Sequence, residues 1–398
     1  MKEGWEYKKL GEIATEMYRG SGIKRDQVTK EGTPCVRYGE IYTTYNISFN
    51  TCVSHTSIQN IASPKYFEHG DLLFAITGES VEDIGKTIAY LGNDKCLCGG
   101  DIICMKHRQN PKYLSYALST PDAIRQKGIG KTKLKVVHTN APALKAISIP
   151  LAPLSEQQSI VDYLDSAFAK IDAMKANAEK ALNEAKALFQ ASLKEMLEPK
   201  EGWKEKYVGD IAEIKGGKRL PKGEKLQSEP TNHKYIRVAD FNDYGTVDLS
   251  DIQYISDKVF EQIKRYIITK DDIYISIAGT IGKSGIIPDE LDGANLTENA
   301  CRLILSNEIH QKFMYYITIS PEFVRQEIES TKISAQPKLA LTRLAGIIIS
   351  YPSIIEQQKI AETLDSLKSK VDRLQENYDK ISQECDALKQ SILRQVFE

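Results

Sequence analysis

The sequence of 398 residues lacks several features that would set it apart from ordinary globular proteins. No stretch approaches the roughly 18 consecutive apolar residues that a membrane-spanning helix needs. The N-terminal residues 1–6 contain no apolar segment, so we expect no secretory signal. The seven cysteines include no C-x-x-C pair, which argues against a disulfide framework and favours a reducing, cytoplasmic location. The length suffices for two or three domains.

The net charge of −1 hides an uneven distribution along the chain. Residues 1–150 carry 20 Lys and Arg against 15 Asp and Glu, a balance of +5. The balance is −2 in each of the segments 151–200 (6 against 8), 201–350 (20 against 22) and 351–398 (7 against 9). The basic first block therefore permits a polyanionic partner but does not demonstrate one.

Complete catalytic motifs are also missing. Three Gly-Lys-Ser/Thr triplets begin at Gly85, Gly130 and Gly282 and resemble the end of a nucleotide-binding loop, G-x-x-x-x-G-K-[ST]. The first glycine of that motif is replaced each time, by Ser80, Arg125 and Ile277. The chain has no Ser-His-Asp arrangement, no H-E-x-x-H, no G-x-G-x-x-G and no [DN]-P-P-[YFW] tetrapeptide of an amino-group DNA methyltransferase. These absences argue against an NTPase and against a fused DNA methyltransferase.

One cluster of potential metal ligands has the wrong spacing for a metal site. Cys96, Cys98, Cys104 and His107 lie close together in the sequence. Zinc sites favour cysteines separated by two to four residues, and the second half of the chain has no equivalent cluster. We interpret these cysteines as buried or partly exposed thiols and expect no metal.

The most informative feature is an internal duplication with a shift of about 200 residues. Matching segments keep their order along the chain: 10–14 with 208–212, 71–78 with 272–279, 84–87 with 281–284, 119–126 with 319–326, and 156–160 with 356–360. Short β-branched runs such as 71–76 and 272–277 are typical of strands, whereas 111–126 and 309–329 indicate short helices. Each half therefore has a mixed segment of about 150 residues followed by a long helix.

Both long helices are predicted from a heptad pattern of apolar residues. Ten steps from Val161 to Met196 cover 35 residues, and nine steps from Ile360 to Ile392 cover 32. Such spacing is typical of a coiled-coil seam. Ser155 and Ser353 are the predicted N-caps. We expect helices over 155–197 and 354–397 that pack antiparallel to each other.

Basic residues recur at matching places in the two halves. Arg37 and Arg237 coincide in the repeat, and arginine suits the reading of guanine, while lysine suits phosphate. Lys86 and Lys283 occupy the repeated Gly-Lys loops, so we expect Lys86→Ala and Lys283→Ala each to lower the salt slope of DNA binding by about one. The full set of candidate DNA-binding residues is Lys24, Arg25, Arg37, Tyr38, Lys86, Thr87, Lys131, Lys133, Lys215, Lys218, Arg219, Arg237, Lys283, Ser284, Lys332 and Lys338.

These features together resemble the specificity subunit of a type I restriction–modification system. The resemblance rests on the duplicated Trp5 and Trp203 segments, on the strand–glycine pairs ending at Gly78 and Gly279, and on the Glu-Gln-Gln helix starts at 156–158 and 356–358. It covers nearly the whole chain. The second helix departs from the pattern, because it opens with Tyr-Pro-Ser-Ile-Ile at 351–355.

The resemblance implies an α+β fold with two similar mixed α/β target-recognition domains, 1–150 and 201–350. An antiparallel coiled coil of two long helices, in segments 151–200 and 351–398, would separate them about a pseudo-two-fold axis. It further implies that the chain has no catalytic centre of its own and that it binds a bipartite, asymmetric site on double-stranded DNA. Modification subunits with S-adenosylmethionine and restriction (motor-nuclease) subunits with ATP and Mg²⁺ would be its partners. The alternative is a coiled-coil scaffold whose globular ends bind proteins.

Overall fold

The computed structural model describes residues 4–130, 136–331 and 338–398. The chain divides into two compact units, and each contains one end of both long helices. Unit 1 comprises Met1–Asn177 with Asp379–Glu398, and unit 2 comprises Ala178–Tyr378. The division of the chain at residues 150, 200 and 350 stays a prediction.

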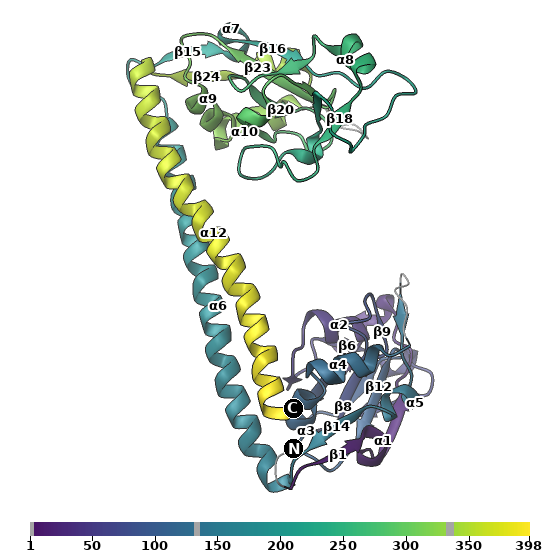
Figure 1. Ribbon diagram of the computed structural model, residues 1–398. Coiled ribbons are helices and arrows are strands. Elements are labelled where there is room, and N and C mark those ends of the chain that lie inside the picture. Colours follow the sequence, from purple (N-terminus) through teal and green to yellow (C-terminus); the bar gives the residue numbers. More distant parts are fainter. Residues whose placement is uncertain (1–3, 131–135, 332–337) are drawn as a thin grey trace. The chain divides into compact units, whose positions relative to one another are not determined.

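The two long helices confirm the heptad prediction. Helix α6 spans Leu154–Leu197 and helix α12 spans Ile354–Phe397 (Figure 1). In unit 1 the Sγ atom of Cys385 lies 3.8 Å from the carbonyl oxygen of Ile171. In unit 2 the Nζ atom of Lys186 donates to Oε1 of Gln375 at 2.7 Å. Within unit 1, Asp172 contacts Lys389 and Lys175 contacts Asp386, so residue numbers rise along α6 as they fall along α12 and the helices pack antiparallel there.

Of the two predicted N-caps of the long helices, Ser353 is confirmed and Ser155 is not. Ser353 precedes α12, and its Oγ accepts a hydrogen bond of 3.4 Å from the Glu356 amide, which confirms it as the cap. Ser155 is wrong as a cap because α6 already begins at Leu154. The Glu156 amide donates instead to the carbonyl oxygen of Pro153 at 2.9 Å, so the first turn closes on the proline.

Unit 1 is built on two five-stranded sheets. The first has the order β2 (Glu16–Arg19), β12 (Ile102–Lys106), β8 (Leu72–Ala75), β10 (Thr87–Tyr90), β5 (Ser48–Phe49). The second has the order β3 (Val28–Thr29), β6 (Ser54–Thr56), β4 (Thr33–Val36), β11 (Cys96–Cys98), β7 (Tyr66–Phe67). Two short pairs complete it: β1 (Glu6–Lys9) with β14 (Ser148–Leu151), and β9 (Thr77–Gly78) with β13 (Val137–His138).

Unit 2 repeats this plan with four-stranded sheets. The first has the order β16 (Ala212–Gly216), β23 (Ala300–Leu305), β20 (Ile273–Ser276), β21 (Ser284–Ile286). The second has the order β18 (Gln253–Ile255), β17 (His233–Ile236), β22 (Ala294–Leu296), β19 (Ile267–Ile268). The pair β15 (Lys204–Tyr207) with β24 (Ile348–Tyr351) matches β1 with β14. The repeat seen in the sequence is therefore a repeat of structure.

Short helices pack beside these sheets (Figure 1). In unit 1 they are α1 (Leu10–Ile13), α2 (Tyr38–Thr43), α3 (Pro111–Ala117), α4 (Pro121–Gly128) and α5 (Ala141–Lys145). In unit 2 they are α7 (Val208–Ile211), α8 (Asp257–Ile263), α9 (Gln311–Thr318), α10 (Pro321–Ser330) and α11 (Leu341–Ala345). The 3₁₀ turns are Arg25–Gln27, Ile58–Asn60, Val238–Asp240 and Asp289–Leu291. The segments 111–126 and 309–329 are each two helices, because Thr120 and Ser320 cap a new helix that opens with proline.

The Glu-Gln-Gln motif anchors each long helix to its globular domain. Gln157 and Gln357 are both fully buried. The Gln157 amide nitrogen donates to the carbonyl oxygen of Ala152 at 2.9 Å, and its Oε1 accepts from the Asn110 amide at 2.9 Å. Gln357 makes the matching bonds to Pro352 at 3.0 Å and from His310 at 2.8 Å. Because a buried amide must satisfy its polar atoms, each glutamine ties the helix start to the loop before α3 or α9.

The C-terminal part of each long helix is built into the core of the unit it reaches. Phe397 of α12 packs edge-on against Trp5 and Tyr113 in unit 1, with ring centroids 6.2 and 5.3 Å apart. Phe189 of α6 packs against Tyr316 in unit 2, with centroids 6.4 Å apart. Neither globular core is complete without the helix that arrives from the other half of the sequence.

Candidate nucleic-acid interface

The two Gly-Lys loops take equivalent positions beside the central strands. The Gly85 amide donates to the carbonyl oxygen of Ala75 at the end of β8, and the Gly282 amide donates to Ser276 at the end of β20. Both glycines have a positive φ, +73° and +88°. Glycine is favoured there because other residues rarely adopt this backbone conformation. The loops are thus a repeated tight turn.

Lys86 does not have the exposed side chain that a phosphate contact needs. Its Nζ atom donates to the carbonyl oxygens of Tyr45 and Tyr42 at 3.0 and 3.3 Å, at the C-terminal end of α2. Burial lowers the pKa of this ammonium group. Lys86 is therefore half-buried, because unpaired helix carbonyls attract a cation.

Lys283 is more accessible. Its Nζ atom lies 2.9 Å from Asp243 and 3.3 Å from the carbonyl oxygen of Phe241, and its side chain is 34% exposed. The lysine lines a cleft of about 420 Å³ in unit 2 to which Lys186 of α6 and Lys368 of α12 also contribute. Since Asp243 is almost fully exposed, a phosphate can compete for this lysine, and the phosphate role of Lys283 stays a prediction.

The hydroxyl groups of the two triplets point inward. Thr87 is 3% exposed and donates to the carbonyl oxygen of Gly85 at 2.9 Å. Ser284 is 7% exposed and shares a hydrogen bond of 2.8 Å with the hydroxyl group of Thr318. Both were candidate DNA contacts, but the structure buries their hydroxyl groups, because each is the first residue of a buried strand, β10 or β21.

Opposite charges lie buried at matching places behind these loops. Lys127 of α4 donates to Leu118 at 2.8 Å and to Thr87 at 3.2 Å, and burial lowers its pKa to about 7. Glu327 of α10 is 4% exposed, and burial raises its pKa to about 7. The Oε1 atom of Glu327 has no hydrogen-bond partner within the described part of the chain. Neither group is placed to contact DNA, but both make stability depend on pH.

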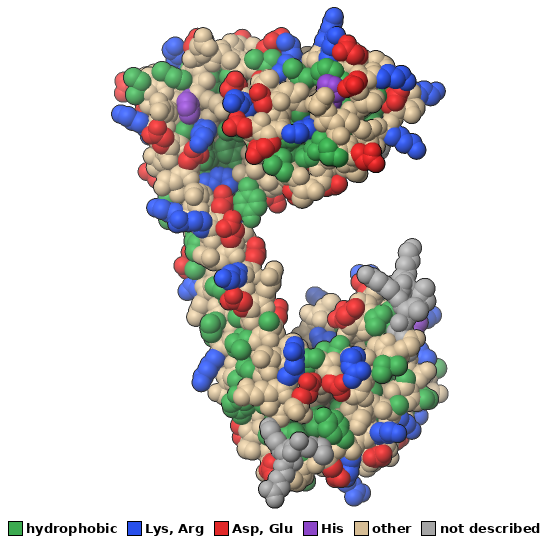
Figure 2. Space-filling model, viewed as in Figure 1, with side chains coloured by type: hydrophobic (Ala, Val, Ile, Leu, Met, Phe, Trp, Pro, Cys, Tyr) green, Lys and Arg blue, Asp and Glu red, His purple; other side chains and the backbone are tan. Residues whose placement is uncertain are grey.

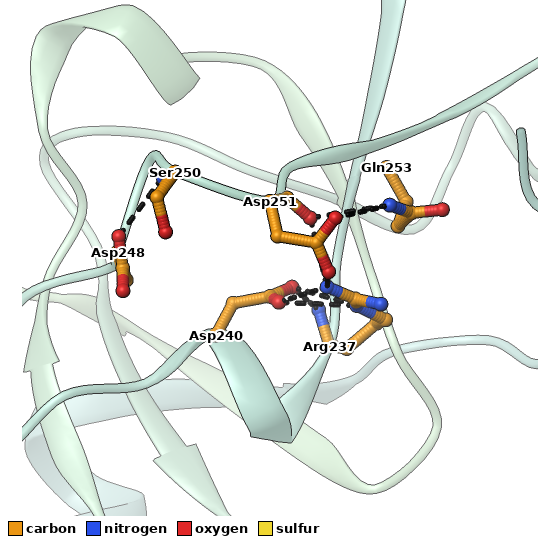
Figure 3. A network of polar contacts seen from close by, with 6 residues as sticks. All are labelled: Arg237, Asp240, Asp248, Ser250, Asp251 and Gln253. Carbon is orange, nitrogen blue, oxygen red and sulfur yellow. Dashed lines mark hydrogen bonds and ion pairs between the residues drawn. The ribbon is translucent and has the colours of Figure 1, made fainter. Parts of the chain in front are cut away.

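Arg37 and Arg237 are held by acidic residues three positions further on. The Nε atom of Arg37 lies 3.1 Å from Glu40. Arg237 contacts Asp240 at 2.5 Å and Asp251 at 3.0 Å (Figure 3). Each arginine amide also donates to the same acid, so the pair opens a short helix. Each guanidinium group is thus paired with an acid in this structure, and the base-reading role of both arginines stays a prediction. Tyr38, beside Arg37, remains 39% exposed.

The other candidates differ in how free they are. Lys24, Arg25, Lys215, Lys218, Arg219 and Lys338 are exposed. Among these, Arg219 pairs with Glu298 at 2.6 Å, Lys215 pairs with Glu213 at 2.9 Å, and Lys218 lies 5.5 Å from the ring centre of Tyr266. Lys131, Lys133 and Lys332 lie outside the described residues. Figure 2 shows cationic and acidic side chains interspersed over the visible faces of both units.

Arg265 and Tyr266 are candidate contacts that the sequence did not reveal. They precede β19 and line a pocket of about 380 Å³ together with Lys215. The sequence pattern that could have indicated them is an arginine–tyrosine pair next to a β-branched strand, but such pairs are common on protein surfaces. Only the fold shows that Lys215, 50 positions earlier in the sequence, lies beside them.

The described residues hold no group of three or more His, Cys, Asp or Glu side chains suited to a metal ion. Cys96, Cys98 and Cys104 are buried in the domain core, as interpreted from their spacing. Burial raises the pKa of the Cys98 and Cys104 thiols. Among the described helices, none has the length and apolar character to cross a bilayer.

Comparisons with known proteins agree with the duplicated fold. The model of the type I restriction modification DNA specificity domain matches twice, at residues 2–184 and 200–383. The specificity subunit of the type I restriction enzyme EcoBI from Escherichia coli is 24% identical over 401 residues, which cover 92% of this chain and 80% of the relative. The StySPI specificity subunit from Salmonella potsdam is 22% identical, and the alignment covers 100% of this chain and 89% of the relative.

Solved structures show the same fold. A chain from a type I R-M system studied for complex assembly and conformational transition has a TM-score of 0.79 at 17% identity, covering 100% of this chain and 98% of its own. The HsdS subunit from Thermoanaerobacter tengcongensis has a TM-score of 0.55 at 17% identity, with coverage of 100% and 97%. The chain therefore belongs to the family of the type I restriction modification DNA specificity domain, of which it carries two copies.

Proposed function

We propose that this protein is the DNA-reading subunit of a type I restriction–modification complex. The observation that carries the proposal is the structural repeat, in which two domains share one fold but differ at equivalent surface positions. Two similar domains on one coiled coil suit the reading of two half-sites. Different side chains on the two domains suit half-sites of different sequence, so the recognised site is bipartite and asymmetric.

The chemistry of the complex belongs to its partners in this proposal. The chain carries no complete catalytic motif in its sequence. Modification subunits would supply S-adenosylmethionine-dependent methylation, and motor-nuclease subunits would use ATP and Mg²⁺. This division of labour places the chain in the cytoplasm, where its DNA and its partners are found.

The test is methylation mapping. The chain is expressed together with its modification subunit in a host that lacks other modification systems, and methylated bases are located by single-molecule sequencing. We expect one non-palindromic, two-part motif. Replacing the globular part of unit 2 by that of another specificity subunit changes one half-site and leaves the other intact. A protein scaffold, the alternative function, would produce no motif and no salt-dependent binding to DNA.

A further inference from the structure

One corner of unit 2 is lined by cations alone among its charged residues. The pocket of about 380 Å³ lies where the end of β16 meets β19 and β22. Its charged lining residues are Lys215, Arg265 and Arg302, and Tyr266 forms part of the wall. We call it the β16 corner.

The register of the strands identifies the matching corner in unit 1. Tyr18 pairs with Cys104 across β2 and β12, as Lys215 pairs with Arg302 across β16 and β23. The carbonyl oxygen of Lys65 accepts the Cys98 amide in unit 1, as that of Tyr266 accepts the Leu296 amide in unit 2. Lys65 therefore corresponds to Tyr266, and Pro64 corresponds to Arg265.

The corner of unit 1 is bridged by a tyrosine hydrogen bond and has two cations, Arg19 and Lys65, at the matching positions. The Tyr18 hydroxyl donates to the carbonyl oxygen of Tyr66, which binds β2 to β7 across the corner. Cys104 donates to Asp71 at 3.6 Å, where Arg302 in unit 2 donates to Asp272 at 2.9 Å. Three neutral residues of unit 1 are thus three cations in unit 2. In the opposite direction two cations of unit 1, Arg19 and Lys65, are replaced by Gly216 and Tyr266. Cations from β16, from β23 and from the segment before β19 meet in one pocket, which favours an anionic ligand.

The three cations of the β16 corner differ in how free they are. Arg302 is 13% exposed and neutralised by buried Asp272, so it forms the base of the pocket. Lys215 is shared with Glu213 in an exposed pair that contributes little energy and that an anion can replace. Arg265 is exposed and makes no hydrogen bond or ion pair with any described residue. Lys218 lies close by, over the ring of Tyr266.

We propose that the β16 corner binds a phosphate group of the DNA backbone, with Arg265 as its main contact and Lys215 as the second. This inference rests on the proposed function. The planar guanidinium group of Arg265 can donate two parallel hydrogen bonds to two phosphate oxygens, and Lys215 adds a point charge. Because unit 1 lacks the equivalent arginine, the contact is specific to the second domain. It fixes that domain on the duplex without reading bases.

The experiment uses the assembled complex with its modification subunits. Affinity for a duplex with the mapped site and for a random duplex is measured over a range of salt concentrations, for the parent and for Arg265→Ala, Arg265→Lys and Lys215→Ala. We expect Arg265→Ala to weaken both duplexes by about tenfold and to lower the salt slope by about one. Arg265→Lys should keep the slope and lose part of the affinity, because it keeps the charge but not the paired hydrogen bonds.

Two variants serve as matched controls. Arg325→Ala removes an exposed arginine of α10 that is paired with Glu322 and Glu329, and Lys65→Ala removes the lysine of the unit 1 corner. Neither should change the slope. An unchanged slope in Arg265→Ala overturns the inference, as does weaker assembly with the modification subunits at intact DNA affinity, which would assign the corner to a protein contact. If the parent complex itself bound no DNA, the proposed function would fail instead.

Discussion

The phenolic oxygen of Tyr316 lies 2.6 Å from Oδ1 of Asp365, and this bond joins α9 to the long helix α12. Tyr116 makes the matching bond of 2.7 Å to Asp165 on α6. In both units a lysine one turn earlier, Lys312 or Lys112, donates to the other carboxylate oxygen. The aspartate on each coiled-coil helix is therefore a repeated attachment point for the globular domain.

Removing the Tyr316 hydroxyl should weaken that attachment. We expect Tyr316→Phe to lower the free energy of unfolding of unit 2 by about 1.5–3 kcal/mol, as for a hydrogen bond to a charged group. Trp203 belongs to unit 2 and Trp5 to unit 1, so urea unfolding followed by fluorescence in a Trp5→Phe background reports on unit 2. Tyr163→Phe, an exposed position on α6, is the control and should change nothing. A loss below about 0.5 kcal/mol would contradict the attachment role.

The buried carboxyl of Glu327 should make unit 2 less stable at alkaline pH. Its folded-state pKa of about 7 lies above the usual 4.5, so the folded state binds the proton more tightly. The stability that it contributes is complete below about pH 4.5 and is lost as the pH rises through about 7. When the pH is raised from 5 to 8, the free energy of unfolding of Glu327→Gln should rise by about 2–3 kcal/mol relative to that of the parent. Parallel pH profiles for Glu327→Gln and its parent would rule out an ionising group at Glu327.

The buried Lys127 should make unit 1 more stable as the pH rises, the opposite of the effect of Glu327 on unit 2. Its folded-state pKa of about 7 lies below the usual 10.5, so the parent gains stability as the pH rises above about 7. Lys127→Met should remove that gain in unit 1, which is followed by Trp5 in a Trp203→Phe background. Parallel pH profiles of stability for Lys127→Met and its parent would rule out an ionising group at Lys127.

The two loop lysines should separate into a structural and a DNA-binding role. Lys86→Met leaves the carbonyls of Tyr42 and Tyr45 without their donor and should cost about 1–2 kcal/mol of stability. It should leave the salt slope of DNA binding unchanged. Lys283→Met should lower the slope by about one at little cost in stability, because its side chain faces an open cleft. Equal changes of the salt slope in both variants would show that the half-buried Lys86 side chain also contacts a phosphate when DNA is bound.

The length of the long helices should set the spacer between the half-sites. Four residues, about one turn, are inserted after Lys180 and after Lys380, which are equivalent positions in the repeat. We expect methylation mapping to find a longer spacer and unchanged half-sites. A changed half-site with a constant spacer would refute the independence of the domains from the coiled coil.

Local sequence was enough for the features that depend on periodicity and on backbone geometry. The heptad spacing predicted α6 and α12 to within a residue or two, because each turn presents its own apolar face. The repeat matched Gly85 with Gly282, and both adopt the positive φ that selects glycine. Duplication predicted that the two mixed segments share a fold.

Only the tertiary structure decided which charged side chains are available. Lys86 and Lys283 sit in matching loops, yet their exposure depends on residues more than 40 positions away, such as Tyr45 and Phe241. Arg237 is engaged partly by Asp251, which a loop brings back to it (Figure 3). The β16 corner joins Lys215 to Arg265 across two strands. Periodicity is a property of consecutive residues, whereas the partner of a charge is set by the folding of distant segments onto one another.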